Sequence, residues 1–325
     1  MAHVLAFANQ KGGVAKTTST LNLGAALTEM GQRVLGVDMD PQANLTMCQG
    51  IDPESVTVGM YEVLMHQAPI TDIIHSAEID VAVASIDLAG AELALSSVIG
   101  RERALQRALK PVLESYDYIL IDTPPSLGLL TINALTAADG VIIPVQCEYL
   151  CLRGLAQLDR TLQMIRENLN PQVHIRGILP TLFDSRTVHG HEAIQVLKEN
   201  FGALVFDTVV RKTIKFAEAP VTGCSMLRYD PKGPGAEAYR ALAREVLTGR
   251  SRYHARRLER AVSQDRRRER GGGADAEVRR RASEDSRDEI KQALRGADLV
   301  FVTAGEGGGH RDRRGRRSSP PWRAK

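Results

Sequence analysis

The stretch Lys11-Gly12-Gly13-Val14-Ala15-Lys16-Thr17-Thr18 decides the fold of this 325-residue chain. An apolar run, Val4–Ala8, precedes it and has the length of a short buried strand. Apolar residues with helical spacing follow it from Thr18 to Met30 and stop before Gly31. A glycine-rich turn between a buried strand and a helix is typical of loops that bind phosphate groups.

The chemistry of this loop favours a nucleotide together with Mg²⁺. Small residues leave backbone N–H groups directed inward, and the helix that follows adds the positive end of its dipole. Lys16 is expected to bridge the β- and γ-phosphates, the Thr17 hydroxyl to ligate Mg²⁺, and Thr18 to donate to the α-phosphate. The expected nucleotide-binding residues of the loop are therefore Gly12, Gly13, Val14, Ala15, Lys16, Thr17 and Thr18.

The loop departs from the ordinary pattern G-x-x-x-x-G-K-[ST] at two positions. Gln10 and Ala15 stand where that pattern has glycine, and an additional lysine, Lys11, lies inside the loop. Ala15 keeps the side chain small, but it is strained wherever the backbone requires a positive φ. We expect this strain to be tolerated without loss of function.

The rest of residues 1–249 alternates between buried strands and helices, which predicts a doubly wound, mostly parallel α/β sheet of the P-loop NTPase type. Ligands of such sheets bind outside the carboxyl ends of the strands. Further strands are expected at 34–37, 79–84, 118–121, 141–145 and 175–179. Further helices are expected at 91–97, 101–113, 129–137, 155–168, 192–200 and 235–247.

Two more motifs end strands of this predicted sheet. Asp38-Met39-Asp40-Pro41-Gln42-Ala43-Asn44 follows the second strand, where a carboxylate can position a water molecule and the metal shell for phosphoryl transfer. Asp122 ends the apolar run Ile119–Ile121, as in the Walker B motif, and is expected to hold Mg²⁺. The predicted metal residues are therefore Thr17, Asp38 and Asp122.

In combination these motifs resemble the ParA/MinD family of ATPases, whose deviant phosphate loop reads K-G-G-x-[GA]-K-T-T. Several stretches make residues 1–249 similar to the ParA/Soj branch, which partitions chromosomes and plasmids. They are Ala8-Asn9-Gln10, Asp40-Pro41-Gln42, Val145–Tyr149, Phe183–Thr187, Glu218-Ala219-Pro220 and Tyr229–Gly233.

The resemblance implies a Mg²⁺-dependent ATPase that acts as a homodimer in the ATP state. It implies that Lys11 reaches across the dimer interface to the partner's nucleotide, so that Lys11, Lys16 and Asp40 form the catalytic set. Asp40 would position the attacking water, with Asp38 in support, and Thr123-Pro124-Pro125 would sense the γ-phosphate. Pro220 is expected to touch the adenine.

The same resemblance implies partners and a location. The ATP-bound dimer would bind double-stranded DNA without sequence preference, and a ParB-type partition protein would stimulate hydrolysis. Arg186 matches a DNA-binding position of the family, and Arg211, Lys212 and Lys215 add positive charge. Such binding must weaken steeply with salt. We expect a cytoplasmic, nucleoid-associated protein that does not bind membranes.

Charge is distributed unevenly along the chain, whose formal net charge is +3. Residues 250–325 carry 22 Lys and Arg against 12 Asp and Glu, whereas residues 1–249 carry 20 against 27. We interpret 250–325 as a basic tail, largely disordered or partly helical. Within it, residues 270–309 resemble a fragment of FtsZ, the tubulin-like division GTPase. His310 follows where that family has Thr-Gly-Thr-Gly, so we expect no GTPase activity. The alternative is a basic arm that assists DNA binding.

Two other functions use the same loop. A MinD-like positioning ATPase needs an amphipathic helix that binds membrane, but residues 250–270 offer only Tyr253, Leu258 and Val262 as larger apolar side chains. A DNA-binding repressor or adaptor would use ATP as a conformational ligand with little turnover. The His189-Gly190-His191 stretch is expected on a surface loop rather than in a metal site.

Overall fold

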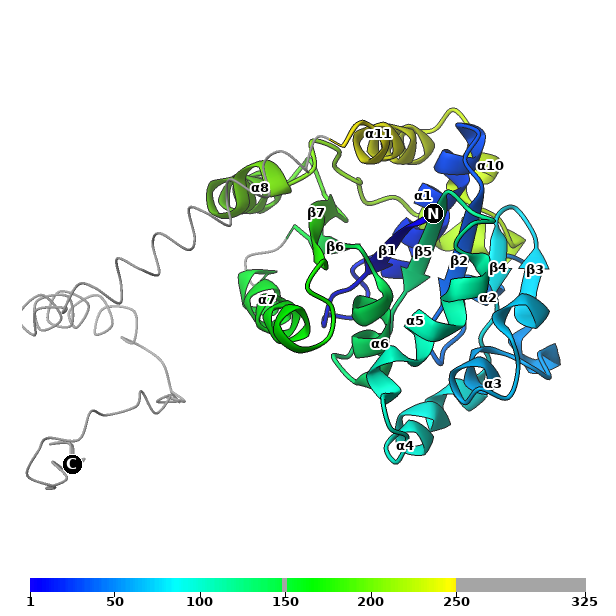
Figure 1. The fold of residues 1–325 in the computed structure, drawn as a ribbon. Coiled ribbons are helices and arrows are strands. Elements are labelled where there is room, and N and C mark those ends of the chain that lie inside the picture. The colour runs from blue at the N-terminus through cyan, green and yellow to red at the C-terminus, as the bar shows by residue number, and fades with distance from the viewer. Residues whose placement is uncertain (148–150, 250–325) are drawn as a thin grey trace, which may run out of the picture. The chain divides into compact units, whose positions relative to one another are not determined.

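The computed structural model describes residues 1–147 and 151–249 and contains a seven-stranded sheet (Figure 1). The strand order is β3-β4-β2-β5-β1-β6-β7, and every neighbouring pair is parallel except β3 with β4. The strands are β1 (His3–Phe7), β2 (Val34–Asp38), β3 (Ile74–Ser76), β4 (Asp80–Ala82), β5 (Tyr118–Asp122), β6 (Gly140–Gln146) and β7 (His174–Thr181). The predicted fold class is thereby confirmed.

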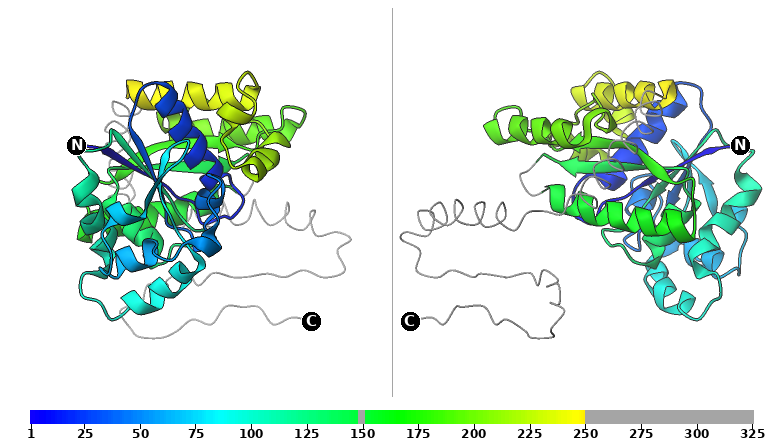
Figure 2. Two further views of the ribbon diagram at one scale, coloured as in Figure 1. Left: turned by 90° about the vertical axis from the view of Figure 1, so that its right-hand side faces the viewer. Right: turned by 60° about the vertical axis from the view of Figure 1, so that its left-hand side comes forward.

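Helices cover both faces of the sheet. On one face, α1 and α11 lie side by side (Figure 2). The core on this face includes Phe7, Leu120 and Leu179. Helices α3, α5, α6 and α7 contribute to the core on the other face. The helices are α1 (Lys16–Glu29), α2 (Asn44–Met47), α3 (Met60–Leu64), α4 (Ala91–Leu95), α5 (Ala104–Leu109), α6 (Leu129–Ala137), α7 (Cys151–Asn168), α8 (Val188–Phe201), α9 (Lys215–Glu218), α10 (Met226–Tyr229) and α11 (Pro234–Thr248).

The three central strands bring the sequence motifs to one edge of the sheet. All five residues of β2 and of β5 are buried, which explains why these strands read as continuous apolar runs rather than alternating patterns. The register pairs Asp122 at the end of β5 with Phe7 on one side and with Asp38 on the other. The phosphate loop, which follows β1, therefore lies beside both acidic motifs.

The short helices α2, α3, α9 and α10 were not predicted, several bounds differ, and three further local features depart from the sequence prediction. Strand β3 was not predicted, since its three residues carry little apolar signal and pair only with β4. The helix predicted at 101–113 is divided into 3₁₀ turns around α5, and Pro111 lies in the second turn. The prediction of a surface loop at His189–His191 is wrong. The Thr187 side chain accepts a hydrogen bond from the Gly190 N–H and caps α8, whose first turn contains both histidines.

Candidate functional site

The phosphate loop enters α1 through a strained residue. Ala15 has φ 67° and ψ 38°, in the left-handed region, and Lys16 is the first residue of α1. The Thr181 hydroxyl at the end of β7 donates to the Val14 carbonyl at 3.0 Å and holds the loop from the other side. The positive φ that makes alanine costly at this position is therefore present, and a contact from a neighbouring strand fixes the loop that contains it.

Lys11 is held by contacts within the chain. Its ammonium donates to Gln146 Oε1 at 2.8 Å, and its backbone N–H donates to Asn9 Oδ1 at 3.0 Å. The Asn9 amide in turn donates to the Pro144 carbonyl at 2.7 Å. Because Pro144 and Gln146 both belong to the end of β6, this strand sets the direction in which Lys11 leaves the loop.

The predicted metal residues Thr17 and Asp122 are in contact. The Thr17 hydroxyl donates to Asp122 Oδ2 at 2.6 Å, and the Thr20 hydroxyl lies 3.4 Å from the other carboxylate oxygen. Asp122 is fully buried, and the hydroxyl of the next residue, Thr123, donates a hydrogen bond to the Phe7 carbonyl at 2.7 Å. Strand β5 and helix α1 thus present a hydroxyl and a carboxylate to the same point.

Asp38 and Asp40 are ordered by a second set of hydrogen bonds. Asp38 Oδ2 accepts from both the backbone N–H and the hydroxyl of Thr46, at 2.9 and 2.8 Å. Its other oxygen accepts from the Asp40 N–H at 3.2 Å, and Asp40 Oδ1 accepts from the Gln42 N–H at 3.0 Å. The acidic motif is therefore a folded turn in which Asp38 supports the backbone of Asp40.

Carboxyl groups outnumber ammonium groups at this site. Burial raises the pKa of Asp122 to about 8, with nearby Asp38 as a second cause, and burial raises the pKa of Asp38 to about 6. Burial lowers the pKa of Lys16, and the nearby Asp122 and Asp40 partly offset this by raising it. Three carboxyl groups and one ammonium group share this largely buried site, and a bound cation would favour the ionised form of the carboxyls.

This donor set fits Mg²⁺ with a nucleotide. Magnesium prefers oxygen ligands and commonly takes one or two protein ligands together with phosphate oxygens and water. Thr17 and Asp122 supply a hydroxyl and a carboxylate beside a helix N-terminus. Among the described residues no group of three or more His, Cys, Asp or Glu side chains is placed to hold a metal ion.

The residues predicted to contact the adenine and DNA lie farther along the chain. Pro220 is half-buried in the 3₁₀ turn η7 (Ala219–Thr222), between α9 and α10. Phe183 forms a bridge with Arg211 and accepts from the Lys212 N–H, which brings both residues next to the Arg186 loop.

Two of these cations have carboxylate partners. Arg186, whose side chain is 87% exposed, pairs with Asp184 at 2.7 Å, and Lys215 pairs with Asp230 at 2.6 Å. The hydrogen bonds from Arg186 hold the pKa of Asp184 well below its usual range, and nearby Lys212 contributes. Arg186, Arg211 and Lys212 thus form one basic cluster, with Lys215 three residues beyond Lys212.

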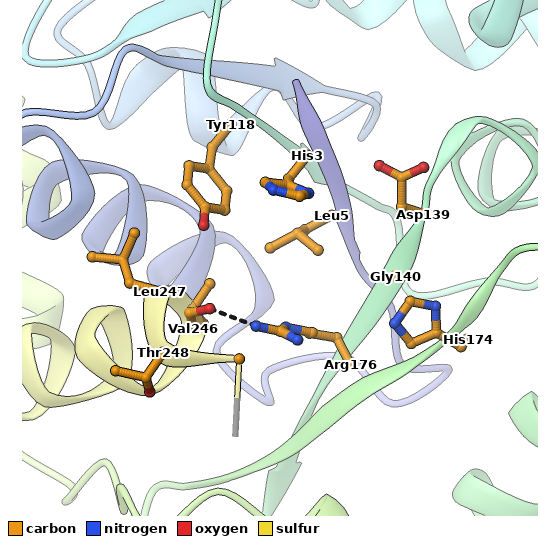
Figure 3. Close-up of a pocket in the computed structure, with 11 residues that line it drawn as sticks. His3, Leu5, Tyr118, Asp139, Gly140, His174, Arg176, Val246, Leu247 and Thr248 are labelled. Atoms are coloured by element: carbon orange, nitrogen blue, oxygen red, sulfur yellow. Dashed lines mark hydrogen bonds between the residues drawn. The ribbon is translucent and has the colours of Figure 1, made fainter. Parts of the chain in front are cut away.

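A separate cavity of about 320 Å³ lies at the opposite edge of the sheet (Figure 3). It is lined by the amino-terminal ends of β1, β5, β6 and β7 and by the end of α11. Arg176 is buried there and donates to the Val246 carbonyl at 2.5 Å, which caps α11. The phosphate loop follows the carboxyl end of β1, so this cavity is not the nucleotide site.

Sequence reasoning missed the residues that hold the predicted ones in place. Asn9 and Asn22 bond to backbone groups, and Thr46 donates its N–H and hydroxyl to the Asp38 carboxylate. A motif alone does not show these partners. Thr46 lies two residues after the acidic motif and eight residues after Asp38. A hydroxyl residue so close to an aspartate at the end of a strand was the signal that could have indicated this contact. Gln146 belongs to Val145–Tyr149, one of the stretches similar to the ParA/Soj branch, but only the order of the strands places it beside Lys11.

The fold and the site together define a P-loop nucleoside triphosphatase domain. The AAA domain family profile matches residues 2–175. The Soj sporulation initiation inhibitor protein of Bacillus subtilis is 48% identical over 249 residues, which cover 76% of this chain and 98% of Soj. The chromosome partitioning protein ParA of Myxococcus xanthus is 43% identical over 250 residues, 76% of this chain and 88% of ParA. The chain belongs to the ParA/MinD superfamily of P-loop nucleoside triphosphatases.

A solved structure is similar in both sequence and fold. Cobyrinic acid a,c-diamide synthase from Mycobacterium smegmatis, with a bound ATP analogue and magnesium, is 42% identical, with a TM-score of 0.68 over 76% of this chain and 95% of that one. None of these comparisons supports the resemblance of residues 270–309 to FtsZ, and that segment lies outside the described residues. Among the described residues no helix is long and apolar enough to span a membrane.

The strained loop residue gives a first prediction. Ala15→Gly should raise the free energy of unfolding by about 1 kcal/mol, because glycine adopts the left-handed conformation without a Cβ clash. Ala43→Gly, at φ 50° before α2, should act in the same direction. Ala241→Gly inside α11 should instead destabilise by about 1 kcal/mol. Urea unfolding measures all three, and equal destabilisation in all three variants would contradict the assignment of strain.

The buried carboxylate gives a second prediction. Asp122 has a raised pKa when folded, so the native state binds more protons than the unfolded chain between pH 4 and 8. The nucleotide-free protein should therefore lose stability as pH rises through this range. Asp122→Asn, which cannot ionise, should show a smaller decrease, whereas the exposed control Asp72→Asn should behave as wild type. Urea unfolding at several pH values tests this, and an identical pH dependence in Asp122→Asn would refute it.

Proposed function

We propose that this chain is a Mg²⁺-dependent ATPase that partitions chromosomes or plasmids. The observation that carries the proposal is the convergence of Lys16, Thr17 and Asp122 with Asp40 at one sheet edge, beside a loop that contains Lys11. Its relatives include a chromosome partitioning protein, and the similar synthase structure holds an ATP analogue with magnesium. The ATPase is assigned to residues 1–249, with 250–325 as a basic appendage.

The residues divide the chemistry among them. Lys16 offers its ammonium to the phosphates from a buried position, where its charge is weakly screened. Bound Mg²⁺ would neutralise the negative charge that develops during phosphoryl transfer. Thr17 and Asp122 would hold that ion. Asp40, whose backbone is fixed by Asp38, would orient the attacking water. Phosphoryl transfer depends mainly on such positioning and electrostatic stabilisation.

The active unit is proposed to be a dimer. Lys11 lies on the exposed side of the loop and is bonded within its protomer to Gln146. To reach the nucleotide of a second copy it would exchange this acceptor for phosphate oxygens, which carry more negative charge. ATP would then be bound by two chains at once.

The dimer would bind DNA through the basic cluster of Arg186, Arg211 and Lys212 together with Lys215. Two copies would double this charge, which allows a domain with net negative charge to attach to the phosphate backbone. A ParB-type partner would stimulate hydrolysis and release the DNA. The protein would then be cytoplasmic and associated with the nucleoid.

Removing the Lys11 side chain should separate nucleotide binding from formation of the dimer. Lys11→Ala should bind ATP with near-normal affinity but remain monomeric, because its ammonium is proposed to serve the partner's site. Lys16→Ala, the control within the same loop, should lose ATP binding. Nucleotide titration and light scattering with a nonhydrolysable analogue measure the two effects. Normal ATP binding by Lys16→Ala would remove the basis of the assigned site.

The basic cluster gives a salt-dependent prediction. Lys212→Glu should weaken binding to any duplex sequence alike and lower the salt slope of log K by about one for each phosphate that is no longer neutralised. Lys110→Glu, an exposed lysine beside α5, should bind as wild type. Fluorescence anisotropy on two unrelated duplexes, with ATP, ADP and a ParB-type partner, checks this. DNA retention without turnover even when partner is present would favour a repressor or adaptor over a partition ATPase.

A further inference from the structure

One segment contains both the proposed adenine contact and a proposed DNA contact. This segment, the α9–α10 segment, runs from Lys215 to Tyr229 and includes η7 with Pro220. Its three helical turns have four residues each, so they gain little stability from their own hydrogen bonds. Its position must therefore be set by contacts with the rest of the domain.

Asn22 makes the most direct of these contacts. Its side chain is 3% exposed and lies on α1, one turn after Thr18. The amide nitrogen donates to the Thr18 carbonyl at 2.7 Å, and the amide oxygen accepts from the Met226 N–H at 2.7 Å. A single buried amide therefore joins the first turn of the phosphate-loop helix to the first residue of α10.

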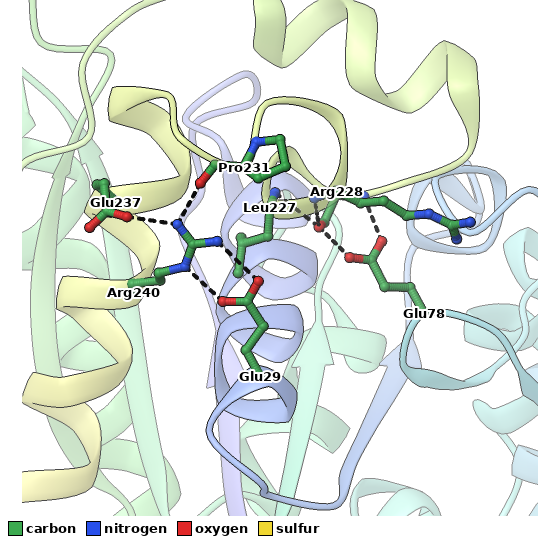
Figure 4. A network of polar contacts seen from close by, with 8 residues as sticks. Glu29, Glu78, Leu227, Arg228, Pro231, Glu237 and Arg240 are labelled. Carbon is green, nitrogen blue, oxygen red and sulfur yellow. Dashed lines mark hydrogen bonds and ion pairs between the residues drawn. The ribbon is translucent and has the colours of Figure 1, made fainter.

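Other contacts hold the segment around this bond. Glu78, between β3 and β4, accepts from the Ser225 N–H at 2.8 Å and from its hydroxyl at 2.5 Å (Figure 4). Gly223, at φ 66°, approaches Gly50 so closely that a Cβ would lie 2.9 Å from the Gly50 Cα. These contacts fix the segment to the side of the domain that includes α2, which follows the acidic motif.

The far end of α1 holds the chain just beyond the segment. Arg240 on α11 donates to the Pro231 carbonyl at 2.6 Å and pairs with Glu29 at 2.7 Å, as Figure 4 shows. Helix α1 is thus linked to the chain on both sides of the 227–230 turn. Asn22 is the nearer of these two links to the phosphate loop.

We propose that Asn22 is the positioning residue that transmits nucleotide occupancy to the DNA-binding side of the α9–α10 segment. The proposal rests on the proposed function, because Lys215 is a DNA contact only if the protein binds DNA. Bound phosphates would fix the position of Thr18 in the first turn of α1. Through its two hydrogen bonds, Asn22 would then fix the position of the Met226 N–H relative to Thr18. Met226 lies eleven residues after Lys215 in a segment whose ends are otherwise fixed.

The buried position of Asn22 makes this link sensitive to substitution. Alanine would leave the Met226 N–H without its acceptor in a region closed to water. Aspartate has the same size and keeps the acceptor, but it offers no donor to the Thr18 carbonyl. The two variants therefore break the link at different ends.

The chain contains a closely matched control in Asn133. It is fully buried on α6, donates to the Leu129 carbonyl at 3.0 Å and accepts from the Leu105 N–H at 3.1 Å. It also donates to the Arg101 carbonyl at 2.9 Å, so its removal costs one hydrogen bond more than that of Asn22. Like Asn22, it bonds the carbonyl four residues earlier and the first turn of another helix. Asn133→Ala therefore removes the equivalent hydrogen bonds without touching the α9–α10 segment.

The experiment compares the affinity for a nonspecific duplex with ATP and without nucleotide, by fluorescence anisotropy on the full chain. The gain that ATP produces should fall about tenfold or more in Asn22→Ala and in Asn22→Asp, and should persist in Asn133→Ala. A gain of wild-type size in either Asn22 variant would overturn the proposal. Equal reductions in Asn22→Ala and Asn133→Ala would overturn it too, because they would mark general destabilisation.

A second measurement separates this inference from the proposed function. If the wild type shows no ATP-dependent DNA binding, the DNA-binding function fails, and amide hydrogen exchange of residues 215–229 tests the link by itself. A nonhydrolysable ATP analogue should then protect these amides, relative to the nucleotide-free protein, in wild type and Asn133→Ala but not in Asn22→Ala. Exchange that does not respond to nucleotide in the wild type would overturn the inference.

Discussion

The site depends on the position of β5 between β1 and β2. This pairing places Asp122 opposite Phe7 and Asp38, so the acidic motifs and the phosphate loop meet without any long side chain reaching toward another. A shift of one residue would turn Asp122 to the other face of the sheet, away from Thr17. The apolar composition of β2 and β5 is thus a requirement of the site as much as of the core.

The same arrangement requires the domain to bury negative charge. Asp38 and Asp122 belong to neighbouring strands and lie in a region that water does not reach. The protein offsets this with hydroxyl and N–H donors from Thr17, Thr46 and Asp40, and with one desolvated lysine. A site that is costly without its cofactor gains the most from binding it.

Much of the fold and of the candidate site could be predicted from the sequence, because the residues that define them lie in short, contiguous motifs. The loop, both acidic motifs, the central strands and the longer helices follow from apolar runs and turn residues. The contacts of Asn22, Glu78 and Gln146 could not be predicted, since each joins segments far apart in the chain through a backbone group or one side chain. Strand β3 was missed because three residues with one apolar side chain carry too little pattern. Residues 250–325 lie outside the described residues, so the domain boundary at 249 stays a prediction.

The carboxylates beside Arg186 and Lys215 bear on how the salt dependence of DNA binding should be interpreted. Asp184 and Asp230 already neutralise these two cations, and a DNA phosphate that replaced them would leave a carboxylate that can itself hold a cation released from the DNA. The salt slope of binding would then indicate fewer neutralised phosphates than the protein holds. At those phosphates one anion would be exchanged for another, and the free energy of the exchange would depend on how well the displaced carboxylate is hydrated rather than on ionic strength.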